Sequence, residues 1–398
     1  MQSPSSRVLA AAPGGALTLL VCLTLTRTAV AFQFQSITLL VDSLRAPAFS
    51  ATGFGVLLGL YMAPGALTAL TSPALIARFG ASATVTGALL LMGAGQAGLL
   101  LSPTHELAYL SRLIAGTGGC VVYIVTIDLA ARYCAAGAMP GRMGAIASSW
   151  PLGNALSLVI LGALISQSLP DAASWIPAAF ALASALLMAW ALQPQRLANT
   201  DTSTPASGPS SSRGVALKDW WNVLPAVLLP GLAFGLYNVS FIVFTSFTPE
   251  LLRGQGYSEL AASTIASLPM WLFVVSVPLG GWLAGRLQSK ARWLVGIGCL
   301  GGSACILLSH MVDGKVLWYV LAGLLGGLPT GAMLARGGKA RHALFYPSLF
   351  LIFFILLLAI PPVVGAVFEA TGILASVPAM CIVLLWAAFL FFVKDESS

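Results

Sequence analysis

The chain has 398 residues, of which 58% are hydrophobic and only 8% are charged, and its mean hydropathy is +0.93. A soluble globular protein carries charge on about a quarter of its residues, so this composition excludes that class and predicts an integral membrane protein. A net charge of +7 would suggest nucleic acid as a partner only in a soluble protein, so we expect no nucleic-acid partner.

Apolar windows long enough to cross a bilayer recur along the whole chain. A helix needs about 20 consecutive apolar residues to span the hydrocarbon core. Twelve such windows are separated by polar loops or by Pro and Gly breaks. They cover residues 16–40, 48–69, 82–101, 105–130, 143–167, 173–193, 220–247, 260–284, 291–311, 316–335, 344–367 and 372–393. We therefore expect an all-α protein with twelve transmembrane helices.

The first window carries Arg27 near its middle and Gln35 in its second half. An ionised side chain at the bilayer centre costs about 2.5–3.5 kcal/mol, against about 4–7 kcal/mol gained from the apolar residues of the window. Arg27 is therefore expected to face a polar cavity. The run after Arg7 also resembles a signal peptide, but its apolar character continues to Leu40, so we expect the segment to stay uncleaved.

Basic residues alternate strongly between the two sides of the predicted bundle. If the N-terminus is cytoplasmic, fourteen Lys and Arg residues lie in inner segments and three in outer loops. The inner set is Arg7, Arg78, Arg132, Arg142, Arg196, Arg213, Lys218, Arg286, Lys290, Arg292, Arg336, Lys339, Arg341 and Lys394, and the outer set is Arg45, Arg253 and Lys315. Cytoplasmic loops carry an excess of Lys and Arg, so this bias predicts a multi-pass protein of the cell inner membrane with both termini cytoplasmic.

The fourth window carries Arg112 and Asp128, with Tyr123 between them. Asp128 follows Arg112 by 16 residues, or about 24 Å along a straight helix, so the two charges cannot pair. We assign Asp128 to a cytoplasmic charge network with Arg78 or Arg132. Arg112 lies near the outer helix end, and two roles are possible for it. It either faces the central path, or it has a structural or gating role and extends outward to the membrane surface.

Residues 194–219 form a polar segment rich in Ser, Thr, Pro and Gly, which predicts a flexible cytoplasmic linker. It separates an N-terminal six-helix half, residues 1–193, from a C-terminal half, residues 220–398. The turn at 73–78 in the first half is echoed by the turn at 281–286 in the second. We expect two six-helix pseudo-repeats with a binding site between them.

The second half supplies Tyr237 and Asn238 as polar side chains on a helix expected to line the central path. No Asp or Glu falls securely at mid-membrane, so a proton-coupled mechanism lacks an obvious buried carrier. Five prolines are expected to kink or end helices: Pro230, Pro278, Pro329, Pro361 and Pro362. The chain has no phosphate-binding loop, no metal-ligand spacing and no nucleophile elbow, so we expect no enzyme activity, cofactor or metal.

The turn after the second window resembles the G-x-L-a-D-R-x-G signature of the major facilitator superfamily. Leu75, Arg78 and Gly80 match this signature, while Pro73 and Ala77 replace its first Gly and its Asp. The missing Asp predicts a thinner network of cytoplasmic salt bridges than the family usually has.

Two further stretches resemble the same family. The second-half copy of the signature matches at Gly281 and Arg286, and the fourth helix resembles the R-x-x-x-G-x-G pattern at Arg112, Gly116 and Gly118. The resemblance implies a monomeric secondary transporter in the lipid bilayer that moves a small molecule by alternating access, with H⁺ as a possible coupling ion. It places substrate binding at Arg27, Arg112, Gln35, Tyr123, Tyr237 and Asn238, and cytoplasmic gating at Arg78, Gly80, Asp128 and Arg286.

The chemistry of the buried arginines favours an anionic substrate. A guanidinium keeps its proton and offers five donors in a fixed fork that fits a carboxylate or phosphate. In having the pair Arg27 and Arg112, the chain resembles the organic-anion and anion:cation symport branches of the family. In having Arg27, it also resembles the cyanate-type porters. Other possibilities stay open. Arg27 pairs with carbonyl or carboxylate groups or serves in gating; the chain exports hydrophobic, drug-like compounds or metabolites coupled to protons; or it is a sensor or scaffold that keeps the fold without transport.

Overall fold

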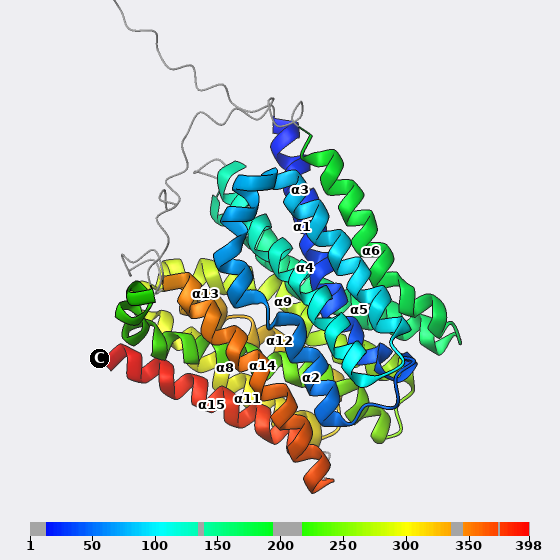
Figure 1. Ribbon diagram of the computed structural model, residues 1–398. Helices are drawn as coiled ribbons and strands as arrows, with labels where there is room; N and C mark the ends of the chain where they lie inside the picture. The colour runs from blue at the N-terminus through cyan, green and yellow to red at the C-terminus, as the bar shows by residue number, and fades with distance from the viewer. Residues whose placement is uncertain (1–12, 134–138, 194–216, 336–344, 373–374, 398) are drawn as a thin grey trace, which may run out of the picture.

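The computed structural model describes residues 13–133, 139–193, 217–335, 345–372 and 375–397 (Figure 1). The described residues form helices joined by short turns, and none of them lies in a β-strand. Most of the predicted linker, residues 194–216, lies outside the described part of the chain, as do Arg7, Arg336, Lys339 and Arg341.

Two groups of helices follow one another along the chain. The first helix group consists of α1 (Pro13–Leu40) with the 3-10 turn η1 (Val41–Ser43), α2 (Ala51–Met62), α3 (Gly65–Leu101), α4 (His105–Tyr133), α5 (Met139–Ser166) and α6 (Pro170–Ala191). The second helix group consists of α8 (Leu217–Gly254), α9 (Glu259–Leu287), η3 (Gln288–Ala291), α10 (Arg292–Gly296), the π-helical turn η4 (Ile297–Gly301), α11 (Gly302–Met311), α12 (Lys315–Gly326), α13 (Pro329–Ala335), α14 (Phe345–Thr371) and α15 (Ser376–Ser397).

The helix content fits the twelve predicted spans. Eleven helical segments of the described chain are long and apolar enough to cross a membrane, and Ala51–Met62 is a shorter apolar helix. The predicted span 48–69 is interrupted at Pro64, between α2 and α3, because proline has no N–H to continue the helix. Helix α3 contains Gly80 at φ 79° and ψ 160°, which separates the second predicted span from the third.

The proline prediction is confirmed at Pro329; at the other four positions no helix ends, and a kink there stays a prediction. Helix α12 ends at Gly326 and α13 begins at Pro329, so this span is broken where expected. Pro230, Pro278, Pro361 and Pro362 instead lie inside continuous helices. A membrane helix tolerates such prolines because neighbouring groups satisfy the freed backbone carbonyls.

The two helix groups meet along two seams. Helix α1 packs on α5 and α6 in the first group, and α8 packs on α14 and α15 in the second. The groups contact each other mainly where α5 lies against α9 and where α2 lies against α14 (Figure 1). We call the end of the bundle where α1 begins and α15 ends the basic end, and the opposite end, where α1 ends and α15 begins, the far end.

Candidate functional site

Arg27 lies in the middle of α1 and is only 3% exposed. Its Nε donates a hydrogen bond to Oγ of Ser149 on α5 at 3.2 Å, and Nη1 donates to the carbonyl oxygen of Tyr123 on α4 at 2.7 Å. The guanidinium carbon lies 3.9 Å from the centre of the Tyr123 ring. Within the described residues Nη2 makes no hydrogen bond, so one arm of the fork stays available to a ligand.

Arg112 on α4 has a different environment, because its side chain is fully buried and all three guanidinium nitrogens donate to carbonyl oxygens. Nε donates to Leu57 at 3.1 Å, Nη1 to Gln33 at 3.1 Å and Nη2 to Phe34 at 2.6 Å. The guanidinium carbon also lies 4.4 Å from the centre of the Tyr61 ring. The side chain therefore ties α4 to both α1 and α2.

The structure does not bring Arg27 and Arg112 together. Arg27 contacts α4 at Tyr123, which is eleven residues beyond Arg112, or about 16 Å along the helix axis. The donors of Arg112 are occupied by the backbone. Of the two arginines predicted to share an anion, only Arg27 keeps a free donor near the space between the helix groups.

A cavity lies between the two helix groups, next to the ring on which Arg27 stacks. The empty space between its side chains, including the part that opens to solvent, is about 610 Å³. The first helix group contributes Met62, Tyr123, Trp150 and Asn154. The second contributes Phe234, Tyr237, Asn238, Phe241, Ile242, Met270, Phe273, Phe350, Phe353 and Phe354. The described lining is thus aromatic and uncharged.

Three of the residues predicted to bind substrate line this cavity: Tyr123, Tyr237 and Asn238. The Tyr237 hydroxyl is buried, and Asn238 donates to the carbonyl oxygen of Phe234 at 2.7 Å. Gln35 is not among the residues that line it; its amide nitrogen donates to the Thr38 hydroxyl at 2.9 Å and to the Ser246 hydroxyl at 3.4 Å.

Sequence reasoning missed most of the aromatic lining. The Trp150 ring meets the Tyr123 ring edge to face, at an interplanar angle of 87° with ring centres 5.7 Å apart. In the orientation that satisfies both ends of its amide, Asn154 accepts from the Trp150 indole at 3.3 Å and donates to the Ala31 carbonyl at 2.9 Å. The sequence of α14 contains several phenylalanines that could have indicated an aromatic lining. The residues between them are also apolar, so the sequence does not show which side chains face the cavity.

The predicted gating residues lie at the basic end. Gly80 adopts a positive φ that only glycine takes readily, which explains why the turn between the two spans needs this residue. Arg78 and Arg286 are exposed, and each lies over an aromatic ring, at 5.3 Å from Phe79 and 4.0 Å from Trp282. Asp128 lies on α4, five residues before the helix ends at Tyr133.

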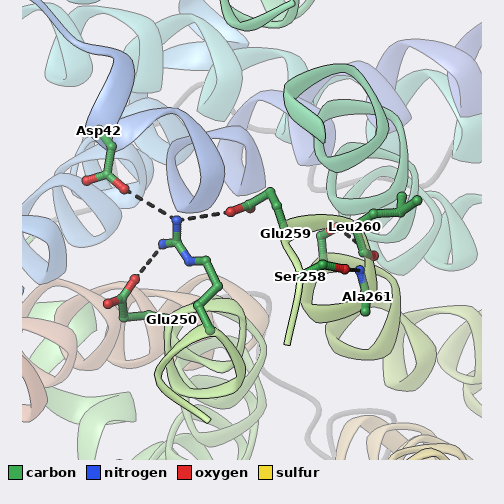
Figure 2. A network of polar contacts seen from close by, with 8 residues as sticks. Asp42, Glu250, Ser258, Glu259, Leu260 and Ala261 are labelled. Carbon is green, nitrogen blue, oxygen red and sulfur yellow. Dashed lines mark hydrogen bonds and ion pairs between the residues drawn. The ribbon is translucent and has the colours of Figure 1, made fainter. Parts of the chain in front are cut away.

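Arg253 connects the two helix groups at the far end, where three carboxylates surround it (Figure 2). It pairs with Glu250 on α8 at 2.5 Å and with Glu259 on α9 at 3.1 Å, both in its own helix group. Its third partner, Asp42 at 3.6 Å, belongs to η1 in the first helix group. This set of ion pairs therefore spans the boundary between the groups.

A second set of contacts closes the far end between α2 and α14. Glu369 accepts hydrogen bonds from the backbone N–H of Thr52 at 2.6 Å and from its hydroxyl at 2.8 Å, where the positive end of the α2 dipole favours a carboxylate. One turn further along α2, the backbones of α2 and α14 are in direct contact. A Cβ added to Gly55 would lie only 2.6 Å from the backbone nitrogen of Pro362. The α2–α14 seam is thus packed backbone against backbone.

Comparison with known proteins agrees with this architecture. A model of the Major Facilitator Superfamily matches residues 17–335, so the chain belongs to this family of membrane transporters. None of the curated proteins compared with the chain matches it. Within the described residues, no group of three or more His, Cys, Asp or Glu is placed to hold a metal ion.

The chain is similar in fold to two solved structures of a bacterial homologue of the human lysosomal transporter Spinster. The inward-facing, unoccupied form has a TM-score of 0.70 at 14% identity, covering 97% of this chain and 96% of that one. The inward-facing, occupied form has a TM-score of 0.69 at 15% identity, covering 95% and 96%. The likeness agrees in fold with the family match, which makes the chain a transporter embedded in the membrane by multiple helices.

Proposed function

We propose that this transporter moves a small organic anion with an apolar body by alternating access, with residues 1–193 and 220–398 as two halves that rock about a central site. The cavity between the helix groups supports this hypothesis. Its aromatic walls suit a flat apolar body, and Arg27 lies beside them with a permanently charged guanidinium.

The single observation that carries the proposal is the position of Arg27. A charge at this depth is costly unless it serves a polar partner. Two of its nitrogens are held by Ser149 and Tyr123, which fixes the direction of the fork, while Nη2 has no partner in the described chain. An oxyanion reaching past the Tyr123 ring would complete the hydrogen bonding of this arginine.

The second candidate, proton-coupled efflux of hydrophobic compounds, is favoured by a different observation. None of the described side chains that line the cavity is charged. A neutral aromatic molecule would fit such walls without help from Arg27. The two candidates therefore differ in whether Arg27 controls uptake.

Transport into liposomes distinguishes the two candidates when the substrates form matched pairs. Benzoate and benzamide, together with larger aryl carboxylates and their amides, share a shape and differ in charge. We expect saturable uptake of carboxylates and a decrease of about 10- to 150-fold for Arg27→Gln, because a hydrogen bond to a charged group contributes about 1.5–3 kcal/mol. Arg27→Lys should retain only part of the activity, since an ammonium cannot copy the fork.

Arg45→Gln is the matched control, because it removes one exposed positive charge at the far end. It should leave uptake unchanged. Equal uptake of acid and amide, with no effect of Arg27→Gln on either, would refute the anion and support the hydrophobic substrate.

The described conformation supports an inward-facing state, because the contacts of Arg253 and Glu369 join the helix groups at the far end. We infer that the basic end is cytoplasmic, from the charge bias of the sequence. Location in the inner membrane, coupling to protons and the monomeric state stay predictions.

A further inference from the structure

A second groove lies on the outer surface of the second helix group, away from the central cavity. It runs between α10 with η4 on one side and α15 on the other, and its empty space, including the part that is open to the surroundings, is about 1020 Å³. Its walls are formed by Arg292, Trp293, Gly296, Ile297, Leu300, Phe389, Phe392 and Val393. Because this surface lies on membrane-spanning helices, the bilayer surrounds it.

The walls of the groove are apolar and partly open. Ile297 is 47% exposed, Leu300 is 42% exposed and Val393 is 45% exposed, whereas Phe392 is buried at the base. The π-helical turn η4 forms part of one wall, and such turns are frequent at functional sites. An extended hydrocarbon chain matches this lining.

Uncompensated positive charge marks the basic end of the groove. Arg292 is exposed and makes no hydrogen bond or ion pair within the described residues, so its five donors are available. Arg286 and Lys290 are also exposed, within six residues of it along the chain, and no Asp or Glu occurs between Glu259 and Asp313. The acidic residue closest along the opposite wall is Asp395, two positions after Val393 and adjacent to the basic Lys394.

Trp293 gives the depth of this end of the groove. Its side chain is 62% exposed, and Trp282, over which Arg286 lies, is 52% exposed. Tryptophan is enriched at the level of the lipid headgroups, where its ring is partly in apolar and partly in polar surroundings. Arg292 therefore lies where the phosphate of a phospholipid would be found.

We propose that this groove is a binding site for one anionic phospholipid. The headgroup phosphate accepts hydrogen bonds from Arg292, and an acyl chain follows Ile297, Leu300 and Phe389 between the helices. A basic site at a helix end prefers a lipid with net negative charge over a zwitterionic lipid with the same chains. The occupant is thus separate from the transported molecule, and the site stands or falls independently of the substrate.

The test uses the full-length protein in detergent and two lipids with identical acyl chains, phosphatidylglycerol and phosphatidylcholine. Retention of each lipid is measured by native mass spectrometry over a titration. We expect one phosphatidylglycerol to be retained at least tenfold more tightly than phosphatidylcholine. Arg292→Gln should remove this preference, and Ile297→Trp, which fills the groove, should weaken retention of both lipids.

Arg45→Gln is again the control for loss of one positive charge, and it should retain phosphatidylglycerol like the unmodified protein. Thermal unfolding in lipid-free detergent checks that each variant is folded. The proposal is overturned if phosphatidylcholine is retained equally well, or if Arg292→Gln and Arg45→Gln have the same effect. Unchanged retention in Ile297→Trp would place the lipid elsewhere on the surface.

Discussion

The α2–α14 seam offers a sharp test of alternating access, because a single methyl group can disturb it. A Cβ added at Gly55 would overlap the Pro361 carbonyl and lie 2.6 Å from the Pro362 nitrogen. These are backbone atoms of α14, which cannot rotate away as a side chain can. Non-bonded carbon atoms prefer separations of about 3.5–4.0 Å, so Gly55→Ala forces the two backbones apart by about 1 Å.

The expected consequence is a shift toward the conformation in which the far end is open. Overpacking of this kind costs about 1–3 kcal/mol in the state that holds the contact. The penalty applies only while α2 and α14 touch, so the population of the far-end-closed state should fall by about 5- to 150-fold relative to the open one. No charge and no group lining the cavity is changed.

The population is measured by electron spin resonance distances between nitroxides on Asp171→Cys and Asp313→Cys, in a background without other cysteines. Both positions are exposed, at the far end of the first and second helix groups respectively. We expect a longer distance to become populated in Gly55→Ala. Gly87→Ala is the matched control, because a Cβ there meets no atom within 4 Å. If Gly55→Ala keeps the distances of the parent, or if Gly87→Ala shifts them equally, the seam is not the gate.

Two further predictions concern the arginine tie and the topology. Arg112→Lys should lower the thermal midpoint of unfolding, measured by intrinsic fluorescence in detergent, because one ammonium cannot reach all of Leu57, Gln33 and Phe34, and each lost hydrogen bond costs about 1.5–3 kcal/mol. Unchanged stability together with lost substrate binding would instead make Arg112 a substrate ligand. A single cysteine at Ser207, in the predicted linker, should react with an impermeant maleimide in inverted vesicles, which expose the cytoplasmic side to the reagent, and not in intact cells. Labelling in intact cells would reverse the proposed topology.

The sequence predicts the number of spans and the depth of Arg27 well, for a clear physical reason. Hydropathy locates the segment that spans the bilayer, because the length and apolar content of a segment determine whether it inserts. The depth of a residue then follows from its position within that segment. Arg27 could therefore be placed in the middle of α1 before its partners were known. Gly80 was placed in the turn between two spans by its match to the loop signature, and its positive φ in the structure is one that glycine takes readily.

The direction in which a buried side chain points is not encoded in the same way. Arg112 was predicted to share an anion with Arg27, yet its partners are carbonyl groups of α1 and α2. Those acceptors become available only when three helices pack, and no local pattern reports this. The aromatic lining is hidden for a similar reason, since Phe350 and Phe353 look the same in sequence whether they face lipid or a cavity.

The contacts at the far end are well suited to a closure that must open repeatedly. Arg253 keeps Glu250 and Glu259 within its own helix group, so separating the groups breaks only its pair with Asp42, whose side chain is 72% exposed. Exposed pairs of this kind contribute about 0.2–1 kcal/mol. Glu369, also exposed, returns to water when it leaves Thr52. The ionic contacts thus align the closed state, while the close packing of α2 on α14 decides how stable it is, which is why a methyl group at Gly55 should matter more than the loss of a charge.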